Sequence, residues 1–145
     1  MKKLSIPSIS LVLVLFLFSF SSFAQTVTTT VSETSLYRRL GAESGIIAVI
    51  EEAVANMIRD DRINMRFVRA DPNKIKKDWD SIICNKTGGT CTLPVITQKI
   101  KITEPEWKAA IEDIIMALDK FKPREVEKKE LLNVINALRK DYFKE

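Results

Sequence analysis

Histidine is absent from all 145 residues of this chain. Its absence removes the imidazole group as a metal ligand, as a general base and as a charge that changes near neutral pH. Nucleophilic sites of the Ser-His or Cys-His kind are therefore excluded. The sequence also lacks a phosphate-binding loop and any clear constellation of a nucleophile with paired carboxylates. We therefore do not expect an enzyme.

Long apolar runs are scarce as well. One run, Leu11–Phe18, follows Lys2 and Lys3 and precedes small residues that end at Ala24. This pattern is typical of a secretory signal peptide over residues 1–24. An uncleaved N-terminal anchor is the alternative, but the run is short for a membrane span. We expect an exported protein, periplasmic or secreted, with no stable membrane anchor after cleavage.

The net charge is small. The formal charge of +4 falls to +2 once the two lysines of the signal peptide are removed. A value this small gives no indication of nucleic-acid binding, for which a strongly basic surface is expected. The lysine clusters of the chain are most simply the solvated faces of helices.

Cysteine occurs twice, at Cys84 and Cys91. Export would place both residues in an oxidising compartment, which favours a disulfide between them. A zinc site is the alternative, but this spacing, without a second cysteine pair or a histidine, is not that of zinc ligands. The stretch 85–87 between them fits a glycosylation sequon, although its simpler role is to end a helix before Gly88 and Gly89.

The remaining sequence reads as helices separated by breakers. Residues 25–33 are rich in threonine and predict a flexible leader, because a short edge strand there would have no partner. Residues 34–145 predict one all-α domain, in which apolar residues recur at helical spacing. The expected helices begin at or near Ser35, Ser44, Asp71, Thr103 and Pro123. Their apolar faces predict a core that includes Leu36, Ile46, Ile47, Ile50, Val54, Met57, Ile58, Ile75, Trp79, Ile82, Ile83, Trp107, Ile114, Leu118, Val126, Leu131, Ile135 and Leu138.

The order of these helices and breakers resembles the group 1 truncated haemoglobins. The similarity covers nearly all of residues 35–143, and four stretches carry it: 35–41, 48–67, 84–91 and 102–107. The resemblance implies a truncated globin-like two-over-two helical sandwich. In the family this fold encloses haem and binds oxygen or nitric oxide.

The positions that hold haem in the family are altered here. The resemblance places Thr97 where the family has its proximal histidine, and a threonine hydroxyl is a poor ligand for haem iron. Val54 takes the place of a distal tyrosine, and Trp79 that of a residue that is often polar. Phe67 matches an aromatic residue that packs on haem, although ordinary core packing would also explain it. An empty haem-sized cavity would be costly, so we expect the pocket to be diminished or closed.

Two functions follow from these observations. The first is a haem-free, exported globin-fold protein that acts as a binding, sensing or structural module, with no cofactor and with an unknown small molecule or protein as its partner. The second is a truncated haemoglobin that binds haem and oxygen or nitric oxide through an axial ligand other than histidine. The candidate ligands are Met57, Met65, Tyr37, Lys99 and, if reduced, a cysteine thiolate.

Overall fold

The computed structural model describes residues 34–67, 70–95 and 100–144. The predicted signal peptide, the predicted leader over residues 25–33, Thr97 and Lys99 lie outside these ranges. In order, the described elements are α1 (Leu36–Arg39), α2 (Ala42–Arg59), the 3-10 turn η1 (Asn64–Arg66), α3 (Pro72–Lys86), β1 (Ile100–Lys101), α4 (Glu104–Phe121), α5 (Glu125–Tyr142) and β2 (Phe143–Lys144). The prediction of a predominantly helical domain is confirmed.

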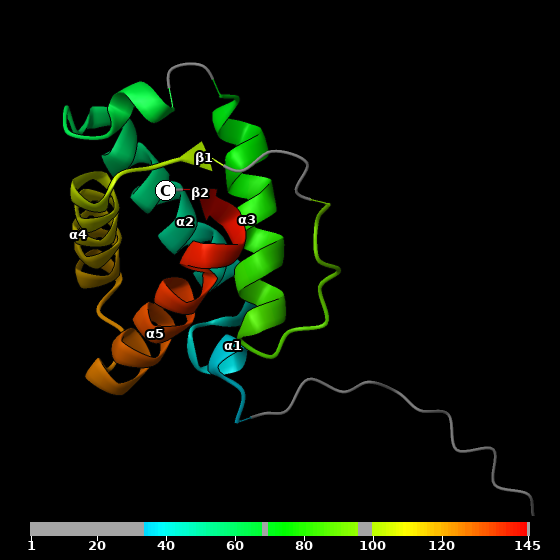
Figure 1. Ribbon diagram of the computed structural model, residues 1–145. Helices are drawn as coiled ribbons and strands as arrows, with labels where there is room; N and C mark the ends of the chain where they lie inside the picture. Colours follow the sequence, from blue (N-terminus) through cyan, green and yellow to red (C-terminus); the bar gives the residue numbers. More distant parts are fainter. Residues whose placement is uncertain (1–33, 68–69, 96–99, 145) are drawn as a thin grey trace, which may run out of the picture.

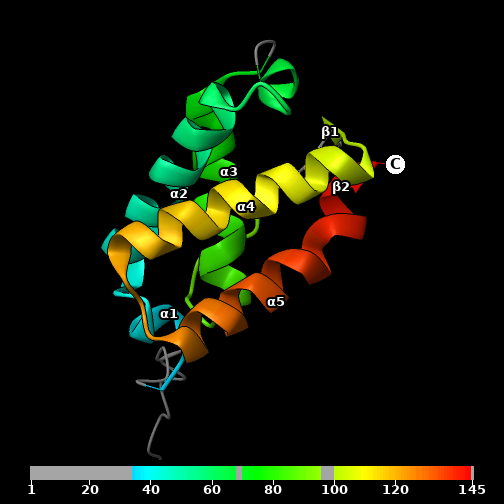
Figure 2. The ribbon, with the colours of Figure 1, turned by 90° about the vertical axis from the view of Figure 1, so that its left-hand side faces the viewer.

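The helices α2, α3, α4 and α5 form the body of the molecule (Figures 1 and 2). Helix α2 packs against both α3 and α4, and α5 also contacts α3. Helices α4 and α5 follow one another through a short turn, and α5 runs back toward the end of the molecule at which α4 begins (Figure 2). Helix α1 lies across the lower end in both views, in contact with α2 and α5. None of the described helices combines the length and apolar character needed to cross a membrane.

Most helix boundaries follow from local capping. The Asp71 side chain accepts a hydrogen bond from the Asn73 amide at 2.9 Å, and Pro72 occupies the first turn of α3. Helix α4 begins with the predicted capping box, because Thr103 and Glu106 satisfy each other's backbone amides. These caps supply partners for amide groups that a helix start otherwise leaves unsatisfied.

The start of α2 differs from the prediction of a helix capped by Ser44. The helix begins at Ala42, and Gly41 stands at its N-cap in the left-handed region with φ 91°. The Gly41 carbonyl accepts from the Gly45 amide at 3.2 Å, so the helical ladder already runs before Ser44. The Ser44 hydroxyl donates to that same carbonyl instead of capping an amide. Glycine permits this turn because it lacks the Cβ that makes positive φ costly.

The core lies among these helices and contains most of the predicted apolar positions. Some predicted core residues are exposed instead. Val126 is 62% exposed and Ile58 is 41% exposed, and Ile47 is at the edge of exposure with 36%. Val126 lies in the first turn of α5 and Ile58 in the last turn of α2, where the helix ends leave the core. Helical periodicity alone does not say where along a helix the packed face stops.

A two-residue parallel pairing joins β1 to β2, with Ile100 opposite Phe143 and Lys101 opposite Lys144. It brings the end of α5 beside the segment that leads into α4 (Figure 1). No alternating pattern in the sequence indicated this pairing, because strands of two residues carry no periodic signal.

Candidate functional site

A small apolar cavity lies among α2, α3, α4 and α5. Its volume is about 30 Å³, which by volume is room for roughly two water molecules. Every lining side chain is apolar, so the wall offers no charged group and no fixed hydrogen-bond donor beyond what Trp79 carries. The cavity is lined by Leu40, Ile46, Val49, Ile50, Ala53, Val54, Met57, Phe67, Ile75, Trp79, Ile83, Ile114, Leu131 and Ile135.

Three of the four predicted haem-pocket positions meet at this cavity. Val54 and Phe67 are 4% and 8% exposed, and Trp79 is partly buried at its edge. Val54 comes from α2, Trp79 from α3, and Phe67 from the turn after η1. The fourth position, Thr97, lies outside the described residues, so its place relative to the cavity stays a prediction.

The cavity is small, and its identity with a diminished haem pocket stays a prediction. Bulky side chains from several helices occupy its wall, and they leave only about 30 Å³ among them. Such close packing agrees with the high density of protein interiors, in which large voids are rare.

The candidate axial ligands do not gather here, with one exception. Met57 lines the cavity and is 2% exposed, whereas Met65 is 71% exposed. Tyr37 does not line it, and burial followed by the nearby charges of Glu43 and Asp80 raises the pKa of its phenol. Lys99 lies outside the described residues. Met57 is therefore the one described candidate that lines the cavity.

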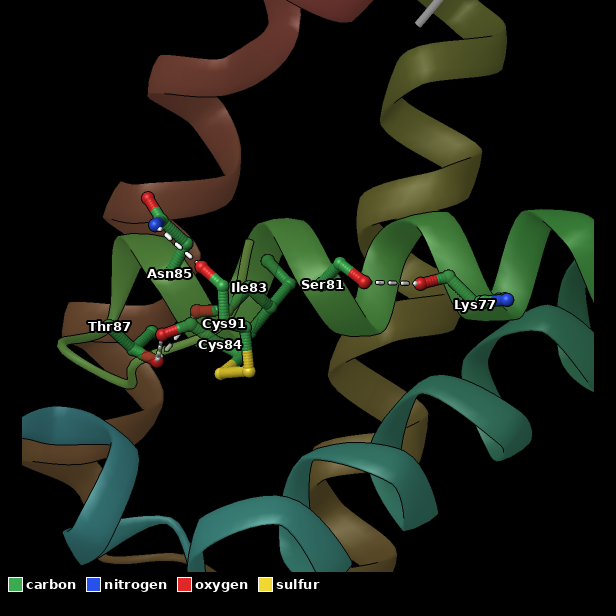
Figure 3. Close-up of a disulfide and its surroundings, with 7 residues drawn as sticks. All are labelled: Lys77, Ser81, Ile83, Cys84, Asn85, Thr87 and Cys91. Carbon is green, nitrogen blue, oxygen red and sulfur yellow. Dashed lines mark hydrogen bonds between the residues drawn. A yellow bond between two sulfur atoms is a disulfide. The ribbon is translucent and has the colours of Figure 1, made fainter. Parts of the chain in front are cut away.

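The cysteine thiolate alternative is excluded by a disulfide between Cys84 and Cys91. Figure 3 shows the bridge at the C-terminal end of α3. The Cys84 side of it is buried, with 1% exposure, and the Cα atoms are 5.8 Å apart. The disulfide predicted from the expected export is present.

The residues enclosed by the bridge end α3 through hydrogen bonds (Figure 3). The Asn85 side-chain amide donates to the Cys91 carbonyl at 2.9 Å, and the Thr87 hydroxyl donates to the Ile83 carbonyl at 2.6 Å. Thr87 is 5% exposed. The Thr87 hydroxyl thus closes the end of α3, and the Asn85 side chain ties that end to the loop that follows.

Gly88 and Gly89 suit the loop closed by the disulfide, the first through its backbone conformation and the second because it has no side chain. Gly88 has a φ of 95°, in the left-handed region. A Cβ on Gly89 would lie 2.4 Å from the Cys84 sulfur and 2.9 Å from its carbonyl oxygen. The loop also holds α1, because the Thr87 carbonyl accepts from the Tyr37 amide at 2.9 Å.

Comparison with known proteins identifies the architecture. No protein-family model matches the sequence, and no curated protein matches it either. The ferric truncated hemoglobin from Tetrahymena pyriformis superposes with a TM-score of 0.67 at 20% identity, over 77% of this chain and 99% of that one. The chain has the truncated-globin fold. A second solved structure, the 2/2 hemoglobin from Synechococcus sp. PCC 7002 in the cyanomet state with covalently attached heme, matches with a TM-score of 0.63 at 20% identity, over 70% and 90% of the two chains.

The truncated-globin likeness concerns the architecture of the chain. Identity of 20% shows the fold alone and carries no residue roles from those proteins to this one. Placement in group 1 and loss of the proximal histidine stay predictions from the sequence. The cavity shows only that Val54, Phe67 and Trp79 surround one small apolar space in this truncated-globin fold.

Proposed function

We propose that this protein is a haem-free truncated globin that is exported and acts as a binding, sensing or structural module. The observation that carries the proposal is the cavity of about 30 Å³, which is too small for haem and is walled by apolar side chains. Haem proteins hold iron through a histidine, thiolate, methionine or tyrosine ligand. Histidine is absent from the chain, and both cysteines are oxidised.

Packing gives the proposal its physical basis. A haem-sized void would forfeit the contacts of every side chain around it, at a cost that grows with the cavity volume. The rings of Phe67 and Trp79, together with isoleucines from α2, α3 and α5, occupy the space around the residual cavity. The fold can therefore remain packed without a prosthetic group, and its partner would be a small molecule or a protein.

The direct test is a titration of the mature chain, residues 25–145, with haemin. We expect no Soret band that saturates at one equivalent. A sharp band that saturates at one equivalent, or tightly held haem in protein isolated from its own host, would overturn the proposal. N-terminal sequencing of the exported protein tests the signal peptide, and a mature N-terminus at Gln25 is expected.

One observation favours the alternative of a haem protein with an unusual ligand. Met57 presents the only described candidate ligand at the cavity wall, and methionine coordinates iron in some haem proteins. The matched variant is Met57→Leu, which keeps a similar volume and removes the sulfur. If wild type gives a saturating band and Met57→Leu loses it, the alternative is correct. A band that persists in the variant would assign the ligand elsewhere in the chain.

A further inference from the structure

Asp113 is a fully buried carboxyl group with no hydrogen-bond partner among the described residues. It lies in the middle of α4, its residue is 1% exposed, and both of its carboxylate oxygens are unpartnered. Every other side chain in the buried stripe of α4 is apolar. A buried polar group without a partner is rare in native proteins and calls for an explanation.

The side chain lies in the contact between α2 and α4. On α2, the Asn56 amide donates to the backbone carbonyl of Asp113 at 3.2 Å, and so it binds the main chain of this residue and not its carboxyl group. The contact between these two helices is the most extensive in the domain. A change in charge at Asp113 therefore acts on the main packing interface.

The neighbouring charged groups are already engaged with one another. Arg62 donates to both oxygens of Asp60 and, at 2.6 Å, to Glu112. Arg59 donates to the Asn56 side chain at 2.8 Å. The charges that face Asp113 from α2, the following turn and α4 are thus two carboxylates and two arginines, and neither guanidinium bonds to it.

We propose that Asp113 is a proton-operated switch in the α2–α4 contact, which keeps the two helices packed when its carboxyl group is protonated and loosens them when it is ionised. An ionised carboxylate without a partner is strongly disfavoured in a protein interior. The chain relieves that cost by opening the contact locally, so that water reaches the carboxylate. The inference concerns α2 and α4 alone, and it holds whether or not the protein binds haem.

The direction of the pH dependence follows from the same surroundings. Burial, and next the charge of Asp60, raise the pKa of Asp113 from 3.8 to about 6. The folded state therefore holds a proton that the unfolded state has released between these two pH values, and the resulting stabilisation is lost as pH rises through about 6. Between pH 5 and pH 7 this single group should raise the unfolding equilibrium constant about tenfold.

The first experiment compares urea unfolding of wild type and Asp113→Asn across pH 5 to 7. The ratio of their unfolding constants isolates Asp113 from the other titrating groups, and we expect it to change about tenfold over this range. The matched control is Asp119→Asn, which removes an exposed carboxylate from the same helix. Its ratio to wild type should stay constant. A constant ratio for Asp113→Asn would overturn the proposal.

Two measurements on wild type keep the test decisive if the variant does not fold. The carboxyl carbon of Asp113, followed by NMR, should titrate near pH 6, and a midpoint below pH 5 would overturn the proposal. Hydrogen exchange, corrected for intrinsic rates, should show that amides of α2 and α4 near Asn56 and Asp113 lose protection from pH 5 to 7 more than those of α3 and α5. Equal loss in all helices would indicate a global effect and would overturn the switch.

Discussion

Removal of the Cys84–Cys91 disulfide should lower the free energy of unfolding by about 2.5 kcal/mol. The bridge joins residues at a sequence separation of 7 and closes a loop of about eight residues. In the chain-entropy relation a loop of this length restricts the unfolded chain by that amount. The suitable variant is Cys84→Ala with Cys91→Ala, because alanine places no unpaired polar group at the buried Cys84 position.

The loss should appear in urea unfolding and as a fall of roughly 10 °C in the melting temperature, given the usual unfolding entropy of a domain of this length. Wild type reduced with dithiothreitol serves as the matched control and should match the variant. Hydrogen exchange should locate the loosening at the end of α3 and at α1, because the Tyr37 amide donates to the Thr87 carbonyl within the loop. A loss under about 1 kcal/mol, or an unchanged α1, would refute the reasoning from loop closure.

Two further predictions concern local contacts. Hydrogen bonds from Arg66 are the main cause that lowers the pKa of Glu106 from 4.5 to about 2. The stabilisation by this carboxylate is therefore present above pH 4.5 and is lost as pH falls toward 2. Glu106→Gln should reduce the loss of stability between pH 4.5 and pH 2, and an unchanged loss would contradict this. Gly89→Ala should cost about 1–3 kcal/mol because its Cβ would overlap the Cys84 sulfur, and calorimetry showing an unchanged melting temperature would exclude that overlap.

The sequence indicated the fold well because several independent signals agreed along the chain. Capping residues at Asp71 and Thr103 marked the starts of α3 and α4, and the double glycine marked the end of α3. The apolar periodicity then placed most of the core on the correct faces. Such agreement between local signals and the global fold is what makes a sequence fold to one structure.

The candidate site was only partly predictable. Periodicity marked Val54 and Trp79 as buried, but it could not show that they meet Phe67, which comes from a turn after η1. Their convergence was inferred from the resemblance to a known fold. Periodicity placed Met57, and not Met65, on a buried helix face, but it could not show that Met57 reaches this cavity. Tertiary packing decides such questions, and a helical pattern does not contain it.

The burial of Asp113 was not predicted, because its neighbour in sequence suggests an exposed position. It follows Glu112, and an acidic pair in a helix usually marks a solvated face. In the structure the two residues point differently, so that Glu112 binds Arg62 while Asp113 is enclosed. One signal was present, since position 113 lies one helical turn before the buried Ala117 and one helical turn after the buried Ala109 and Ala110. A polar residue on an apolar stripe deserves to be tested as buried.

The cavity and Asp113 depend on the same two helices. Ile114 lines the cavity from α4 and Met57 lines it from α2, and each is the direct sequence neighbour of a residue in the Asn56–Asp113 contact. A shift of α2 relative to α4 therefore changes both the shape of the cavity and the solvation of the carboxyl group. A ligand that fits the cavity in only one arrangement would bind with an affinity that depends on pH, and its binding would in turn move the titration of Asp113, because such coupling is reciprocal. In a chain without histidine, a buried aspartate whose pKa burial raises to about 6 would give this truncated-globin fold a route to respond to protons.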